Sequence, residues 1–83
     1  MPVLLRVGPY VFFIVMFDCL ERMHVHVKGG GSGEAKVWLD RDGGLAASTG
    51  YTPRQVERIA GIVRDHRRTL VERWIEACEG ATA

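Results

Sequence analysis

The sequence has little excess charge of either sign. Its 83 residues include 11 lysines and arginines against 10 aspartates and glutamates, which gives a net charge of +1. A domain that binds nucleic acid or an anionic membrane through bulk charge carries a larger basic excess. Overall charge therefore supports neither class of partner. The length allows one domain, residues 1–83.

The sequence also lacks an apolar run long enough to cross a membrane. The longest candidate, residues 10–17, has eight consecutive apolar residues, and a spanning helix needs about 20. A signal peptide would need a small-residue cleavage site after the run, and Asp18-Cys19-Leu20-Glu21-Arg22 offers none. We expect this run to be a core strand of a cytoplasmic protein without membrane contact.

Cysteine is scarce. Cys19 and Cys78 are the two cysteines, and their spacing matches no zinc or redox motif. They could pair with each other. In a cytoplasmic protein, however, we expect two free thiols, because that compartment keeps cysteines reduced.

The first half of the chain has the pattern of β-strands. Strands are predicted over residues 3–7, 10–17, 24–28, 34–40 and, at an edge, 45–48. The run from 34 to 40 alternates, with Ala35, Val37 and Leu39 on one face and polar residues and Trp38 on the other. Glycine-containing turns separate the strands, which indicates two hairpins.

The second half changes to helical spacing. Thr52, Pro53 and Gln55 form a good helix start with a capping box, and Gly80 is a plausible stop. A helix over these residues would be about 40 Å long and would overhang a small sheet. We therefore expect a kink near His66 or a partner beneath the helix end. The predicted fold is α+β, with an antiparallel sheet of four to five strands (1–50) and one long C-terminal helix (51–80) packed on it.

His24 and His26 are the strongest candidates for chemistry. Two residues apart on a strand, their side chains share a face, while Val25 and Val27 point the other way. Two imidazoles and a third donor could bind a divalent metal. Glu34 is the predicted third ligand, because the second hairpin would place Lys36 and Glu34 across from the histidines. Asp18, Glu21 and His66 remain alternatives, as does a solvated strand face that binds nothing.

The same pair could act in acid–base catalysis on RNA. One imidazole would take the 2′-hydroxyl proton, the other would protonate the leaving oxygen, and Lys36 would steady the phosphate. Same-face neighbours on one strand lie about 7 Å apart, which is feasible for this role. The sequence favours a protein that is not an enzyme. If the chain is an enzyme, the expected reaction is RNA phosphodiester cleavage, although the neutral charge does not support RNA binding.

Several motifs together resemble one family. They are residues 1–8, Phe12-Phe13, His24-Val25-His26-Val27, Gly33-Glu34-Ala35-Lys36-Val37-Trp38-Leu39, Tyr51-Thr52-Pro53-Arg54-Gln55-Val56 and Trp74. In this order they are similar to the small bacterial family called domain of unknown function 4160, over nearly the whole chain. Many members have prolines where this chain has Glu21-Arg22-Met23, and Asp18 and Glu21 match acidic positions of some members.

The resemblance implies a partner, because members are often encoded beside a protein of the domain of unknown function 2442 family. That layout is similar to toxin–antitoxin modules, an analogy that carries no mechanism. An edge strand and an apolar helix stripe that includes Leu70 and Trp74 are surfaces for such a partner or for a homodimer. The sequence thus predicts a partner-binding component of a two-gene module with no required cofactor. The alternative is a ribonuclease-like toxin or metal-binding protein that uses His24 and His26.

Overall fold

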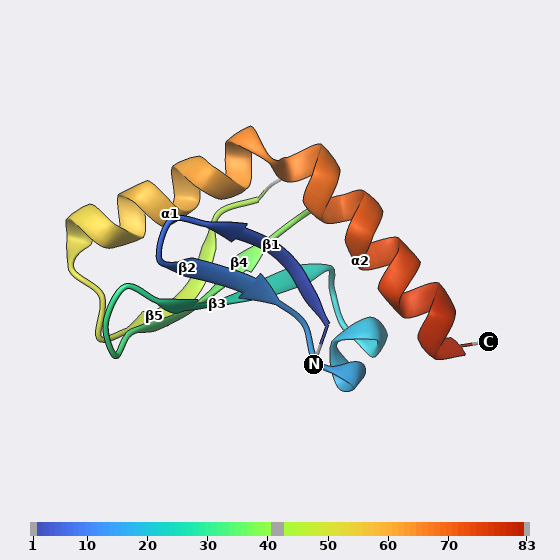
Figure 1. The fold of residues 1–83 in the computed structure, drawn as a ribbon. Coiled ribbons are helices and arrows are strands. Elements are labelled where there is room, and N and C mark those ends of the chain that lie inside the picture. Colours follow the sequence, from blue (N-terminus) through green and yellow to red (C-terminus); the bar gives the residue numbers. More distant parts are fainter. Residues whose placement is uncertain (1, 41–42, 83) are drawn as a thin grey trace.

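The computed structural model describes residues 2–40 and 43–82. A five-stranded antiparallel sheet lies under two C-terminal helices (Figure 1), and the strand order β1-β2-β3-β4-β5 follows the sequence. The elements are β1 (Val3–Val7), β2 (Tyr10–Phe13), the short 3-10 helix η1 (Met16–Leu20), β3 (His24–Gly29), β4 (Glu34–Trp38), β5 (Leu45–Thr49), α1 (Pro53–Asp65) and α2 (Arg67–Thr82). The predicted α+β fold is confirmed.

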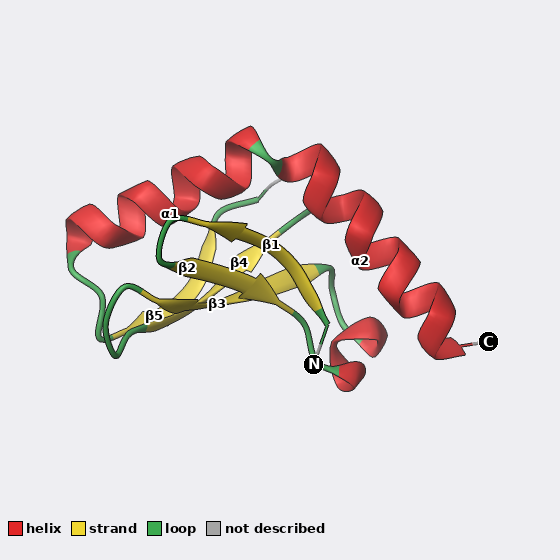
Figure 2. Cartoon of the chain, viewed as in Figure 1, coloured by secondary structure: helices red, strands yellow, loops and turns green. Residues whose placement is uncertain are grey.

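The C-terminal helix is divided at His66. Helix α1 ends at Asp65 and α2 begins at Arg67, so the predicted kink near His66 is confirmed. The two helices meet at an angle above the sheet (Figure 2). Gly80 does not end the helix, because α2 continues to Thr82.

Helix α1 starts with the predicted capping box. The Thr52 hydroxyl accepts from the Gln55 amide at 3.2 Å, and the Gln55 side chain accepts from the Thr52 amide at 3.0 Å. The Gln55 side chain also donates to the Gly30 carbonyl at 2.9 Å. This last bond ties the helix start to the glycine-rich turn between β3 and β4.

The core lies between the helices and the inner face of the sheet. The predicted alternation is confirmed, because Ala35, Val37 and Leu39 are buried while Glu34 is exposed. Leu70 is fully buried and Trp74 is 9% exposed. These two residues pack within the chain's own core, which leaves them little surface for the partner that the sequence suggested.

The apolar run 10–17 is not one strand, and this prediction was wrong. Strand β2 ends at Phe13, and η1 follows from Met16. The Val15 amide donates to the Asp18 carboxylate at 2.8 Å, a bond that turns the chain out of the sheet. As a result Phe17 is 78% exposed instead of lying in the core.

The prediction of two free thiols was also wrong. Cys19 of η1 and Cys78 of α2 form a disulfide, with their Cα atoms 5.5 Å apart. Figure 1 shows why: η1 lies beside the end of α2 that extends past the sheet. Residues 59 positions apart are brought together by the fold, which sequence spacing cannot reveal.

Candidate metal centre

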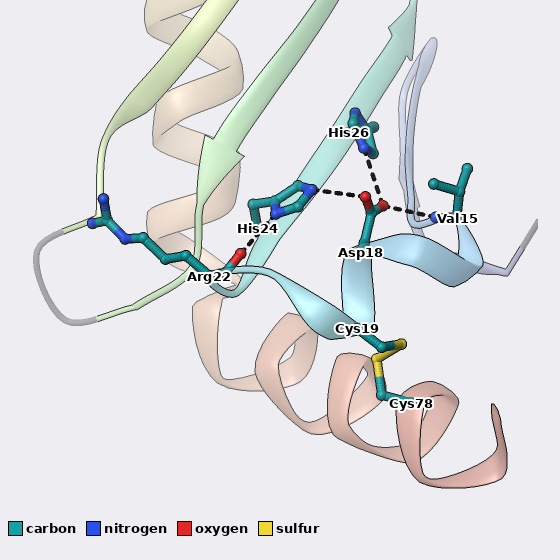
Figure 3. Close-up of a disulfide and its surroundings, with 7 residues drawn as sticks. All are labelled: Val15, Asp18, Cys19, Arg22, His24, His26 and Cys78. Atoms are coloured by element: carbon teal, nitrogen blue, oxygen red, sulfur yellow. Dashed lines mark hydrogen bonds and ion pairs between the residues drawn. A yellow bond between two sulfur atoms is a disulfide. The ribbon is translucent and has the colours of Figure 1, made fainter. Parts of the chain in front are cut away.

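The turn into β3 places one carboxylate between the two histidines. His24 and His26 lie on the outer face of β3, and Asp18 reaches them from η1 (Figure 3). Asp18 Oδ1 lies 3.0 Å from His24 Nε2, and Asp18 Oδ2 lies 3.0 Å from His26 Nε2. One donor atom from each of the three residues falls within 4.8 Å of the other two.

The three side chains differ in exposure. His24 is fully buried and Asp18 is 5% exposed. The His26 side chain is 31% exposed, and its ring stacks on Phe13 with 5.5 Å between ring centroids. The cluster is therefore closed on the His24 side and open on the His26 side.

A backbone carbonyl fixes the orientation of the His24 ring. His24 Nδ1 lies 2.7 Å from the Arg22 carbonyl oxygen. A carbonyl only accepts, so Nδ1 carries the proton and donates. In a neutral ring Nε2 then carries the lone pair, 3.0 Å from Asp18 Oδ1.

His24 Nε2 is close to Asp18 but is not aligned with it. It has no hydrogen-bond partner among the residues that the structure describes, although Asp18 Oδ1 is only 3.0 Å away. A buried lone pair this close to a carboxylate is unfavourable unless a cation lies near both. A proton or a metal ion could be that cation.

Asp18 itself is ionised at neutral pH. Burial raises the pKa of the Asp18 carboxyl, but the Val15 amide and His26 lower it more, with His24 adding to them, so the pKa lies below the ordinary value of 3.8. The carboxylate is thus available as an anionic ligand without losing a proton first.

The arrangement has the parts of a metal site. Two imidazoles and one carboxylate are a known ligand set for zinc and non-haem iron. With bonds of about 2.1 Å, neighbouring ligand atoms lie roughly 3.0–3.4 Å apart. The two separations at Asp18 involve different carboxylate oxygens, and single donor atoms of the three residues lie within 4.8 Å of one another, so the side chains would move closer together around an ion. A metal-binding histidine usually donates its other ring N–H to a carbonyl or carboxylate, as His24 does to Arg22.

Glu34, the predicted third ligand, lies outside this cluster. In the strand register His26 faces Lys36, His24 faces Trp38 and Glu34 faces Lys28. The prediction that the two histidines face Lys36 and Glu34 was therefore wrong, because the register is shifted by two residues. Glu34, Lys36 and His26 instead line a surface hollow of about 180 Å³ beside the cluster. Asp18, which the sequence offered only as an alternative, is the carboxylate that lies with the two histidines.

The remaining sequence candidates lie around the cluster or away from it. Glu21 lies 3.9 Å from His24 Nε2 and 3.7 Å from Lys36 Nζ, at the exposed border. His66 lies at the break between the helices. Sequence reasoning missed Phe13 as the support of the His26 ring, although Phe13 and His26 are paired residues of neighbouring strands.

Residues 10–75 match the family model described as a domain of unknown function (DUF4160). The chain belongs to the DUF4160 family. The matched range contains Asp18, His24 and His26 together with Cys19, whereas Cys78 lies beyond it. Neither the comparison with curated proteins nor the comparison with solved structures finds a match. Among the described residues no helix has the length and apolarity to span a membrane.

Proposed function

We propose that this DUF4160 chain binds a divalent transition-metal ion through Asp18, His24 and His26. The observation that carries the proposal is the buried Nε2 of His24, which has no hydrogen-bond partner in the described part of the chain and lies close to the donor atoms of Asp18 and His26. Two nitrogen donors and one oxygen donor suit zinc, iron(II) or cobalt(II) better than magnesium or calcium.

A site of three protein ligands leaves coordination positions for water or another ligand. Structural zinc sites have four protein ligands, whereas catalytic sites have three and keep one position open. The partly exposed ring of His26 and the neighbouring hollow put the open side of this centre at the surface. A bound ion there would be able to polarise a small oxygen ligand.

The geometry gives less support to metal-free RNA cleavage by two imidazoles. That mechanism needs both rings to touch the scissile phosphodiester. His24 is fully buried, so only His26 could reach a substrate. A buried, protonated His24 paired with Asp18 is the other way to place a cation in the cluster, and metal titration distinguishes it from the proposed site.

The test is calorimetric titration of the purified, oxidised protein with Zn²⁺, Co²⁺ and Mn²⁺. We expect one ion per chain and affinity at least 100-fold weaker in Asp18→Ala. Asp65→Ala, which removes an exposed carboxylate of α1, is the matched control and should bind like the wild type. A wild-type protein that is folded and binds none of the three ions would refute the proposal.

A second function, binding of a small protein encoded nearby, is favoured by the surface of η1. Phe17 is 78% and Leu20 83% exposed, an unusual display of large apolar side chains on so short an element. Such a partner would act with this chain in a two-gene module of the toxin–antitoxin type in the cytoplasm.

Co-purification with the product of the neighbouring gene tests this second function. We expect Phe17→Ser/Leu20→Ser to weaken the complex at least tenfold. Leu45→Ser removes a 40% exposed leucine of β5 and should leave the complex intact. Equal loss in both variants, or none in either, would count against η1 as the contact surface.

A further inference from the structure

We propose that the Cys19–Cys78 disulfide is a redox-controlled tether that sets the metal affinity of the centre. This inference rests on the proposed metal site and adds its regulation. Cys19 follows Asp18 directly in η1, so the covalent link to α2 is one residue away from a metal ligand (Figure 3).

Among the η1 side chains that the structure describes, Phe17 and Leu20 are largely exposed, whereas Asp18 contacts the two histidines and Cys19 is bonded to Cys78. Glu21, the residue after η1, adds an exposed ion pair with Lys36. The backbone bonds of η1 are local, from the Asp18 amide to the Val15 carbonyl and from the Glu21 amide to the Asp18 carbonyl. Such bonds shape the turn but do not attach it to the sheet.

The two histidines are held independently of η1. They belong to β3, which pairs with β2 on one side and β4 on the other. Opening the disulfide would therefore leave the two imidazoles in position, while the carboxylate would keep its polar contacts but lose the covalent link that holds η1 against α2. A third ligand that is less firmly positioned binds a metal ion more weakly.

The disulfide is accessible to small thiols. Cys19 and Cys78 line a surface hollow of about 190 Å³, together with Trp74, Ile75 and Glu79. A reductant thiolate can attack one sulfur there, which breaks the S–S bond and forms a mixed disulfide. A second reductant thiolate then attacks the reductant's sulfur and displaces the protein thiolate. In total two reductant thiols give two electrons and two protons, and one reductant disulfide is formed.

The test compares Co²⁺ affinity in the oxidised wild type, the wild type reduced with a phosphine, and Cys19→Ser/Cys78→Ser. We expect at least a tenfold loss on reduction and in the double variant. The serine variant has no thiolates, so any change in its affinity cannot come from cysteine ligands. In the reduced wild type, a sulfur-to-cobalt absorption band would show whether a freed thiolate binds the ion.

Asp18→Ala is the control that separates a tether from unfolding. Its two-histidine site should bind weakly and equally in the oxidised and reduced states, because its third ligand is already gone. Loss of this residual binding on reduction would mean that reduction disrupts β3, and it would overturn the proposal. Far-ultraviolet circular dichroism of each sample monitors the fold.

Linkage provides a second readout on the wild type alone. A metal that prefers the oxidised form must lower the reduction potential of the disulfide, by about 30 mV for each tenfold of affinity difference. Glutathione titration with and without Co²⁺ measures this shift. Equal affinity in both redox states, with no shift, would overturn the tether while leaving the metal site intact. Absence of binding in every state would refute the metal site itself.

Discussion

On the inner face of the sheet, Phe12, Val25 and Val37 are fully buried beneath the helices, whereas the outer face carries His24, His26 and Trp38. The inner residues contribute through apolar burial, about 1.5–3 kcal/mol for each fully buried side chain. The outer residues interact through charge and hydrogen bonding, which depend on protonation and on bound ions. One face of the sheet thus contributes to stability, and the other carries the polar cluster that we propose binds metal.

The difference extends to the covering segments. The inner face is covered by α1 and α2, which together span most of the second half of the chain. At the histidines the outer face is covered by η1, a five-residue turn fastened by polar contacts and one disulfide. A small cover with few apolar contacts can be moved at low energetic cost, and helices packed on a core cannot.

Two adjacent phenylalanines give the sharpest comparison of the faces. Phe12 is fully buried on the inner face, and Phe13 stacks on His26 on the outer face. Phe12→Ala should lower the free energy of unfolding by about 3–5 kcal/mol, because it leaves a cavity in the core. Urea denaturation of the metal-free protein measures the loss.

Phe13→Ala is the matched control. It removes the same side chain but leaves no comparable cavity, so the free energy of unfolding should fall by less than half as much. Its metal affinity should change more than its stability, since His26 loses the ring that orients it. Equal loss of stability in Phe12→Ala and Phe13→Ala would contradict the view that the inner face contributes more to stability than the outer face.

A smaller effect is expected from the carboxylate of the outer face. Asp18→Ala leaves the partly buried Val15 amide and the two histidines without their anion, which should cost about 1–3 kcal/mol near neutral pH. The pKa of Asp18 is lowered in the folded state, so its contribution is present above the ordinary pKa of 3.8 and is lost as the pH falls through the folded value.

Urea denaturation as a function of pH tests this contribution. The wild type should lose stability relative to Asp18→Ala as the pH falls below about 4. The pKa of Asp40 is also lowered, by its hydrogen bond from Arg22, but that pair is exposed. Asp40→Asn should therefore change the acid profile less than Asp18→Ala does. Parallel profiles for wild type and Asp18→Ala would contradict an ionised Asp18 in the folded protein.

The sequence predicted the parts of this molecule that depend on local periodicity. Alternation in β4, the capping box at Thr52 and the break at His66 are local patterns, and all three are confirmed. The shared face of His24 and His26 follows from strand geometry in the same way. These features need no knowledge of which distant segments meet.

The third ligand could not be predicted, because it depends on a turn and a register. The apolar run 10–17 resembles a strand, but β2 ends at Phe13 and bonds in both directions between Val15 and Asp18 close the turn that follows. The register of β3 and β4 depends on the glycine turn, where Gly29, Gly30 and Gly31 have φ angles of 102°, 71° and 123°. These angles allow pairing to continue to Lys28 and Glu34, which moves Glu34 away from the histidines.

The smallest predicted effect concerns the end of the molecule opposite the site. Thr52 caps α1 beside the glycine-rich turn, whereas η1, which contains Asp18, lies near the far end of α2 (Figure 1). Thr52→Ala should lower the free energy of unfolding by about 1 kcal/mol, because the Gln55 amide loses its acceptor. Thr52→Ser keeps the hydroxyl and should retain most of that stability. Metal affinity should be unchanged in both variants, since neither the position of β3 nor that of η1 depends on the cap. Thr52→Ala could instead lower the metal affinity and Thr52→Ser restore it. The helix cap would then influence the metal centre through the Gln55–Gly30 bond, and the helix side of the sheet would be energetically coupled to the histidine side.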